Sequence, residues 1–364
     1  MVKESNVDGL EENDIMDCEI SKIIEIYNML GDDDSKEIYG LRVLYSLTND
    51  YRYMDRLISK TFPGKWLESK LEEKKGKKVL LYGAGNRGRI LARIYGSYFD
   101  AVIDNNSKVW GKELEGLKII ALPEALEIYP DSVIVLSMKC NRDLISKDLM
   151  RRGISQNRIL DMGEQITKLR NGQYFDLQEL KVHKEEVFVD CGAFDGDSAL
   201  AFMKWCNNHY KHIYCFEPDK NNYVLCEQNL SEEIHKGKCT VFNKGTWSCK
   251  TVLEFSKNSN EASHICEDGT EKIEALSIDA ELLNKGNEKV TFIKMDIEGA
   301  ELETLKGASQ IIAEQKPKLA VCVYHKPEDI FTIPEYLRTL NPDYKFYLRH
   351  YTFAAWDTVL YAIP

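Results

Sequence analysis

The sequence predicts an α/β protein with two units, because the same local pattern occurs twice along the chain. Val79–Tyr82 and Val187–Val189 are short apolar runs of the kind that form buried strands. Each run is followed by a glycine-containing loop and then by a segment with helical spacing of apolar residues, which is how a nucleotide-binding α/β unit begins. The 364 residues are enough for two hydrophobic cores.

Net charge, apolar runs and cysteine spacing indicate which kinds of binding partner and which cellular compartment to expect. The formal net charge of -11 argues against a nucleic-acid or anionic-membrane partner. No apolar run resembles a signal peptide or approaches a membrane-spanning length. The ten cysteines contain no C-x-x-C pair, which indicates reduced, packed thiols and a cytoplasmic protein.

Four segments are expected along the chain. Residues 1–75 form a helical N-terminal extension, 76–162 a Rossmann-like nucleotide-binding domain, 163–185 a polar linker and 186–364 the second α/β domain. In the extension one apolar stripe is predicted at Ile20, Ile23, Ile24, Tyr27 and Leu30. These helices have no evident chemistry and are interpreted as an interface element, with a homodimer left open.

The loop of the first unit favours a phosphate. It has the spacing of the dinucleotide fingerprint, with Gly83, Gly85 and Gly88, and Asp104 follows 21 positions after Gly83. Arg87 adds positive charge and the loop holds no acid. The unit resembles small domains that precede some sugar-modifying transferases, which implies a nucleotide or nucleotide-sugar ligand. An NAD(P)-dependent enzyme and a purely structural unit stay open, although no Tyr-x-x-x-Lys pair follows.

The loop of the second unit carries the opposite charge. Asp190, Asp195 and Asp197 lie close together around Gly192 and Gly196. Such a loop would repel a pyrophosphate and suits a cationic nucleoside, so S-adenosylmethionine is the expected cofactor. A second strand ends at Glu217, whose carboxylate can accept both ribose hydroxyls. The alternative is an ordinary βαβ unit whose acids cap helices, and the loop alone does not separate the two.

A later motif carries a family resemblance. Lys294-Met295-Asp296-Ile297-Glu298-Gly299-Ala300-Glu301, followed by Leu305 and Gly307, fills every fixed position of K-x-D-x-E-G-x-E-x-x-x-L-x-G. In this motif the chain resembles the FkbM family of S-adenosylmethionine-dependent methyltransferases. The segment V-D-C-G-A-F-D-G-D, the F-E-P that ends at Pro218 and the I-D at Asp279 match that family as well.

The resemblance implies a class I methyltransferase fold, with a seven-stranded, mostly parallel sheet and helices on both faces. Its usual acceptors are hydroxyl groups on sugars, glycans or secondary metabolites. The positions expected to bind the cofactor are spread over the ends of four strands and the loops after them: Asp190, Gly192, Phe194, Gly196, Asp197, Glu217, Asn243 and Asp296.

Methyl transfer to an alcohol needs orientation of the reactants and a group that takes the hydroxyl proton. Asp296 and Glu298 follow one strand and His325 follows the next, so all three are candidate catalytic residues at the carboxyl edge of the sheet. The alternatives are a helix cap for Asp296, an ordered turn for Glu298 and a packed histidine for His325. Catechol-type methyltransferases bind magnesium at similar positions, but no second ligand stands out and no metal site is assigned.

Overall fold

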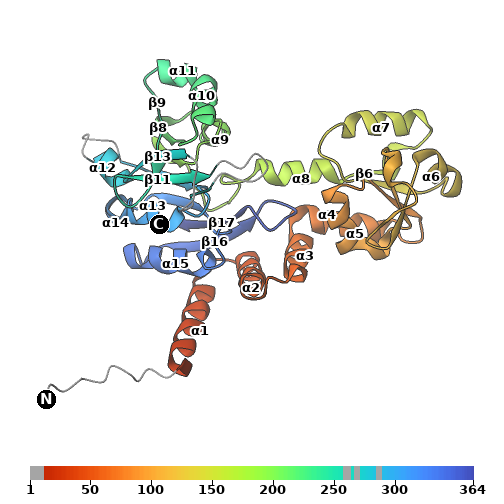
Figure 1. The fold of residues 1–364 in the computed structure, drawn as a ribbon, viewed down its shortest axis with the longest axis horizontal. Coiled ribbons are helices and arrows are strands. Elements are labelled where there is room, and N and C mark those ends of the chain that lie inside the picture. Colours follow the sequence, from red (N-terminus) through yellow and green to blue (C-terminus); the bar gives the residue numbers. More distant parts are fainter. Residues whose placement is uncertain (1–11, 257–263, 266–270, 284–288) are drawn as a thin grey trace. The chain divides into compact units, whose positions relative to one another are not determined.

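The computed structural model describes residues 12–256, 264–265, 271–283 and 289–364, and Figure 1 draws their course as a ribbon. The chain divides into two compact units. The larger unit comprises Met1–Val43, Tyr174–Arg349 and Thr358–Pro364, and the smaller unit comprises Leu44–Gln173 and His350–Asp357. The α/β prediction is confirmed, because each unit is built from a sheet and helices.

The N-terminal segment is helical as predicted, but it is not a unit of its own. Its helices are α1 (Glu12–Met29), α2 (Asp33–Thr48), α3 (Tyr51–Lys60) and α4 (Phe62–Glu73). Ile26 and Leu30 belong to the core of the larger unit, whereas Leu67 and Leu71 belong to the core of the smaller one. The helices therefore divide between the two compact units after Val43.

The apolar stripe predicted on α1 is partly wrong. Ile20 and Ile24 are 50% and 53% exposed, while Ile26, which the stripe omitted, is buried. Apolar residues lie on more than one side of this helix, so their spacing alone did not identify the side that packs.

The smaller unit has a six-stranded sheet in the order β3-β4-β2-β1-β5-β6, in which β3 and β4 pair antiparallel and the other pairs are parallel. Its strands are β1 (Val79–Tyr82), β2 (Ala101–Ile103), β3 (Glu113–Leu114), β4 (Leu117–Ile120), β5 (Val133–Leu136) and β6 (Ile159–Asp161). Its further helices are α5 (Asn86–Tyr95), η1 (Gly96–Tyr98), η2 (Ser107–Val109), α6 (Leu122–Ile128), α7 (Arg142–Arg151), η3 (Gln156–Arg158) and α8 (Met162–Asn171). Helix α8 packs Ile166 into this core, so the first part of the predicted linker is an integral helix.

The larger unit has a seven-stranded sheet in the order β16-β17-β15-β14-β7-β8-β9. The pairs from β9 to β15 are parallel, and β17 runs antiparallel to β15. The strands are β7 (Glu186–Cys191), β8 (Tyr210–Phe216), β9 (Cys239–Phe242), β14 (Phe292–Met295), β15 (Lys318–Cys322), β16 (Lys345–His350) and β17 (Thr358–Ile363).

A small four-stranded sheet accompanies it, ordered β10-β13-β11-β12, with β10 (Gly245–Thr246), β11 (Thr251–Ser256), β12 (His264–Ile265) and β13 (Glu271–Leu276). The remaining helices are α9 (Asp197–Trp205), α10 (Lys220–Asn229), α11 (Ser231–His235), α12 (Ile278–Leu282), α13 (Glu301–Lys306), α14 (Ser309–Gln315) and α15 (Asp329–Leu340). Across the described ranges, no helix is both long and apolar enough to cross a bilayer.

The core of the larger unit lies on both faces of its main sheet. On β7, Val187 and Val189 join an aliphatic cluster, whereas Phe188 points to the other face and stacks on Phe202 with ring centroids 4.3 Å apart. Both faces are therefore covered, as is usual for parallel strands. The polar groups available for chemistry are then those at the carboxyl ends of β7, β8, β14 and β15, which meet at one edge.

Candidate active site at the carboxyl edge of the main sheet

The loop from β7 to α9 depends on two glycines. Gly192 has a φ of +79°, and a Cβ placed there would lie 2.0 Å from the carbonyl oxygen of Asp296. Gly196 has a φ of +91° and immediately precedes α9. Both backbones occupy the left-handed region that glycine adopts without a steric penalty. The two glycines thus bring the loop against the backbone that follows β14.

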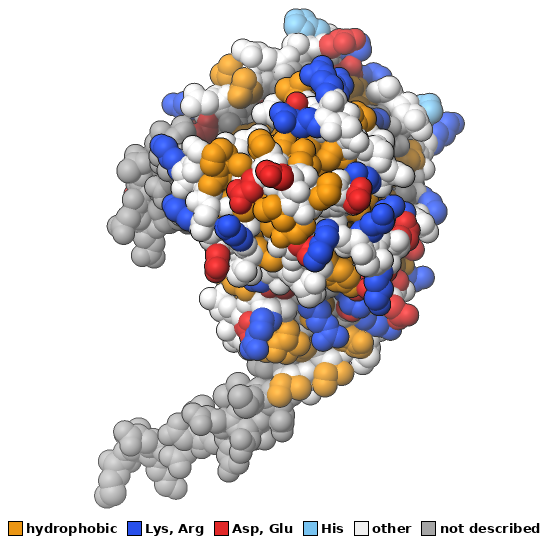
Figure 2. Space-filling model, turned by 90° about the vertical axis from the view of Figure 1, so that its right-hand side faces the viewer, with side chains coloured by type: hydrophobic (Ala, Val, Ile, Leu, Met, Phe, Trp, Pro, Cys, Tyr) orange, Lys and Arg blue, Asp and Glu red, His pale blue; other side chains and the backbone are white. Residues whose placement is uncertain are grey.

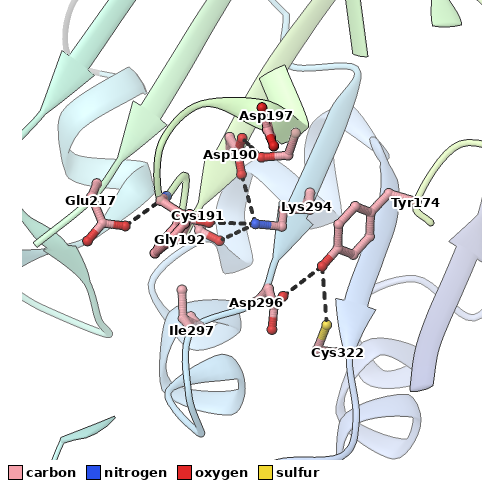
Figure 3. Close-up of polar contacts among 12 residues, drawn as sticks. Tyr174, Asp190, Cys191, Gly192, Asp197, Glu217, Lys294, Asp296, Ile297 and Cys322 are labelled. Atoms are coloured by element: carbon pink, nitrogen blue, oxygen red, sulfur yellow. Dashed lines mark hydrogen bonds and ion pairs between the residues drawn. The ribbon is translucent and has the colours of Figure 1, made fainter. Parts of the chain in front are cut away.

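A buried ion pair lies under this loop. Asp190 is fully buried, and Lys294 Nζ lies 3.1 Å from its Oδ1 and donates to the Gly192 carbonyl at 2.6 Å (Figure 3). Ser198 donates a hydrogen bond to the other carboxylate oxygen. Burial by itself would lower the pKa of Lys294, but the charges of Asp190 and Asp296 outweigh it and hold that pKa above its ordinary value. Lys294 was visible in the sequence as a motif position, without a role.

Glu217 lies at the end of β8 and faces the same loop. Its two carboxylate oxygens accept the backbone N–H groups of Phe194 and Asp219, each at 2.8 Å. Burial raises the pKa of Glu217 to about 7, although the two backbone hydrogen bonds and Lys294 oppose the shift. Asn243 supports this turn by donating to the carbonyls of Glu217 and Pro218 at 3.0 and 3.1 Å.

The other two predicted loop residues present their side chains outward. Phe194 is 59% exposed and has a φ of +50°, so its contribution to the loop is the backbone N–H that binds Glu217. Asp197 is exposed at the first position of α9, where a carboxylate also interacts favourably with the helix dipole.

Asp296 is surrounded by hydrogen-bond donors that the sequence analysis did not identify. Tyr174 donates to Oδ2 at 2.7 Å and Tyr324 donates to Oδ1 at 3.0 Å. Burial alone would raise the pKa of Asp296, but Lys294, His325 and the Tyr174 hydroxyl lower it below its usual value. Tyr174 comes from the predicted linker, where no local pattern marked it, and Figure 3 shows its hydroxyl directed at Asp296.

The structure brings the three predicted catalytic residues, Asp296, Glu298 and His325, close together and adds Glu301. His325 Nε2 lies 3.5 Å from Asp296 Oδ1 and 3.4 Å from Glu298 Oε2, while Nδ1 lies 2.8 Å from Glu301 Oε1. Burial favours the neutral ring, but Glu301 and the other carboxylates raise the pKa of His325 to about 9. At neutral pH the ring is therefore an imidazolium, which weakens His325 as the base.

Glu301 was a motif position without an assigned role. One ligand atom from each of Asp296, Glu301 and His325 lies within 4.8 Å of the others, a grouping that can hold a metal ion. The sequence analysis picked out no second ligand beside Asp296, and the structure adds Glu301 on α13, which turns inward to His325.

In the smaller unit the glycine loop predicted after β1 is formed, and its backbone conformation explains the glycines. Gly83 has a φ of +108°, and a Cβ at Gly88 would lie 1.8 Å from the Gly83 carbonyl oxygen. Gly85 precedes α5 without a side-chain cap. Asp104, however, accepts the backbone N–H groups of Ala84 at 2.7 Å and Asn106 at 2.8 Å. Both of its oxygens therefore hold the loop itself.

Arg87 lies beside other cations. Its pKa is lowered by burial and by the charges of Arg170 and Arg142. Arg142 is itself paired with Asp161 at 3.4 Å, so only part of this positive charge is uncompensated.

Comparison with known proteins finds a family model that matches part of each unit. Residues 190–353 match the model of the Methyltransferase FkbM domain, and residues 75–160 match a model described as C2185-like, N-terminal. The 2-O-methyltransferase NoeI of Sinorhizobium fredii is 19% identical over 192 residues, which cover 45% of this chain and 78% of that protein.

Solved structures to which the chain is similar include a methyltransferase FkbM from Methylobacillus flagellatus. It is 20% identical with a TM-score of 0.49, and the match covers 88% of this chain and 100% of that one. Fibrillarin from Aeropyrum pernix with bound S-adenosyl-L-methionine is 12% identical with a TM-score of 0.35, covering 54% and 74%. The family match falls on the segment that carries the motif and the site, so residues 190–353 form an FkbM methyltransferase domain, and the comparisons indicate an S-adenosylmethionine-dependent methyltransferase.

Proposed function

We propose that this methyltransferase transfers a methyl group to a hydroxyl of a sugar, a glycan or a secondary metabolite. The observation that best supports S-adenosylmethionine binding is the position of Glu217 beside the Gly192–Gly196 loop, at the edge of the seven-stranded sheet. The acceptor side rests on the name of the relative NoeI, which is a 2-O-methyltransferase.

In this proposal the cofactor lies over the loop between β7 and α9. The ribose hydroxyls donate to Glu217, whose oxygens each keep a lone pair beyond the backbone N–H that they accept. Asp190 and Gly192 hold the methionine end. Asn243 lies beside the adenine, and it acts mainly by fixing the Glu217 turn.

The chemistry is an in-line displacement. The acceptor oxygen forms a bond to the methyl carbon as the carbon–sulfur bond breaks, and the hydroxyl proton must leave. Asp296 is the candidate that orients this hydroxyl and accepts its proton. Its lowered pKa makes it a weak base, so orientation is the larger part of its proposed role.

The test is Asp296→Asn, assayed by transfer of labelled methyl from S-adenosylmethionine to a panel of sugars, nucleotide sugars and phenols. Turnover falls by roughly 100-fold or more while cofactor affinity stays, since the amide is nearly isosteric. Asp131→Asn, at a 93% exposed carboxylate, is the matched control and keeps full turnover. Near-normal transfer by Asp296→Asn would remove Asp296 from the mechanism.

For the smaller unit we propose a nucleotide-sugar or nucleotide ligand at the Gly83–Gly88 loop. The specific observation is the cationic group of Arg87, Arg142 and Arg170. An NAD(P) enzyme is the weaker alternative because no Tyr-x-x-x-Lys pair follows the loop, although Asp104, like Glu217, keeps lone pairs beyond the backbone N–H groups that it accepts. A thermal-shift panel tests the proposal: Gly85→Asp should abolish the shift, and no shift with any nucleotide would leave this unit structural.

The expected partners are small molecules and a second copy of the chain. The net charge of -11 disfavours nucleic acid, and on the face in Figure 2 the positive and negative side chains are interspersed. Ile20, Ile24 and Tyr27 leave apolar surface on α1, which we propose as the homodimer contact. A sedimentation experiment in which Ile24→Glu leaves the mass unchanged would refute this contact. The buried, unpaired cysteines fit a cytoplasmic protein.

A further inference from the structure

The polar atoms buried near Asp296 are only partly satisfied. Glu301 Oε2 makes no hydrogen bond within the described part of the chain, whereas the ring nitrogens of His325 meet carboxylates as ion partners, Nδ1 at 2.8 Å from Glu301 Oε1 and Nε2 at 3.5 Å from Asp296 Oδ1. The side chain of Glu301 is fully buried and that of His325 is 8% exposed. A buried carboxylate oxygen without a partner is costly and rare, so Glu301 Oε2 indicates that another group belongs in this cluster.

The geometry indicates what that group is. His325 lies 2.8 Å from Glu301 and 3.5 Å from Asp296. One imidazole and two carboxylates at such separations can ligate a shared ion. All three residues offer a ligand atom within the same 4.8 Å.

The surroundings of the cluster are those of a supported metal site. Tyr174 holds the second oxygen of Asp296 at 2.7 Å, and the Ile297 N–H donates to Glu301 Oε1 at 3.0 Å. Such outer hydrogen bonds fix the orientation of ligating carboxylates in metal centres. Asp296 remains 25% exposed, which leaves a path for an ion and an acceptor.

From these observations we propose that Asp296, Glu301 and His325 bind a divalent transition metal. One imidazole and two carboxylates suit manganese or zinc better than calcium. The catalytic role of this metal rests on the proposed methyl transfer to a hydroxyl. The cation would bind the acceptor hydroxyl and ease the loss of its proton to water. The oxygen would then bond to the methyl carbon as the carbon–sulfur bond breaks.

The experiment is a manganese titration of the EDTA-treated full chain, followed by the loss of the free-ion electron paramagnetic resonance signal. The wild type should bind one Mn²⁺ per chain, and Glu301→Gln should weaken binding at least tenfold. Glu303→Gln lies on the same helix at a 30% exposed side chain and should bind like the wild type. Circular dichroism confirms that each variant is folded.

If Glu301→Gln does not fold, His325→Gln supplies the same comparison. Absence of Mn²⁺ binding by the folded wild type would overturn the proposal, as would equal binding by Glu301→Gln and Glu303→Gln. S-adenosylmethionine binding, measured by calorimetry on the same samples, separates the two proposals. Cofactor binding without manganese binding removes only the metal site, whereas manganese binding without cofactor binding removes only the proposed cofactor site.

Discussion

Cofactor affinity should depend on pH through Glu217, and the structure gives the size of the effect. Burial raises the pKa of this carboxyl to about 7 in the free protein. Ribose hydroxyls donate to the ionised form, so only that form binds the cofactor well. With a pKa near 7, the Glu217 carboxyl is ionised in roughly a tenth of the molecules at pH 6 and in about nine tenths at pH 8. Affinity should therefore rise about tenfold over this interval.

Calorimetry at pH 6 and pH 8, at equal ionic strength, measures this rise. The cofactor has an amino group of its own that titrates, so the quantity to compare is the rise in the wild type minus the rise in Glu217→Gln. The variant cannot ionise at position 217 and should lose the Glu217 part of the dependence, binding more weakly at pH 8. An equal rise in both proteins would refute this role of Glu217.

Folding stability should change with pH in the opposite direction to cofactor affinity. The pKa of Glu217 is higher in the folded chain than its ordinary value of 4.5, so the folded state holds the proton more tightly. The free protein should therefore lose stability as pH rises from about 4.5 through 7. Glu217→Gln should lose less over the same range, which thermal unfolding in the absence of cofactor would record.

Three further changes test the geometry of the site. Lys294→Met leaves the buried Asp190 carboxylate without its cation and should cost about 3–5 kcal/mol in denaturant unfolding, whereas Lys306→Met at a 45% exposed site should be nearly neutral. Gly192→Ala places a Cβ 2.0 Å from the Asp296 carbonyl oxygen, so it should weaken both cofactor binding and stability. Gly237 has a similar φ but open space around it, so Gly237→Ala should have a much smaller effect. Equal effects of the two substitutions would contradict the packing argument. Tyr174→Phe removes the hydroxyl that donates to Asp296 and should cost about 1.5–3 kcal/mol of folding free energy, and an unchanged unfolding midpoint would show that this bond contributes nothing.

The sequence allowed the strands and the glycine loops to be predicted, because both are determined locally. Val187–Val189 is apolar over consecutive positions, and Gly192 stands where only a left-handed backbone closes the turn. Glu217 could be placed for a similar reason, since it directly follows a strand and parallel strands end at a common edge.

Long-range partners could not be predicted in the same way. Tyr174 reaches Asp296 across 122 positions of sequence, and nothing in the polar segment around it marks that contact. Glu301 and Glu303 are both glutamates on α13, so the sequence does not distinguish them. The orientation of the helix buries Glu301 and leaves Glu303 partly exposed. The division of the N-terminal helices at Val43 likewise depends on which core each helix meets.

The most direct test of the account is a crystal structure of the protein with S-adenosylhomocysteine. The account predicts one molecule over the loop between β7 and α9, with both ribose hydroxyls within hydrogen-bonding distance of the Glu217 carboxylate. The amino-acid end should lie at Gly192 and Gly196, where the chain turns above the Asp190–Lys294 pair. Density for the molecule at the Gly83–Gly88 loop, or a ribose that makes no contact with Glu217, would contradict it.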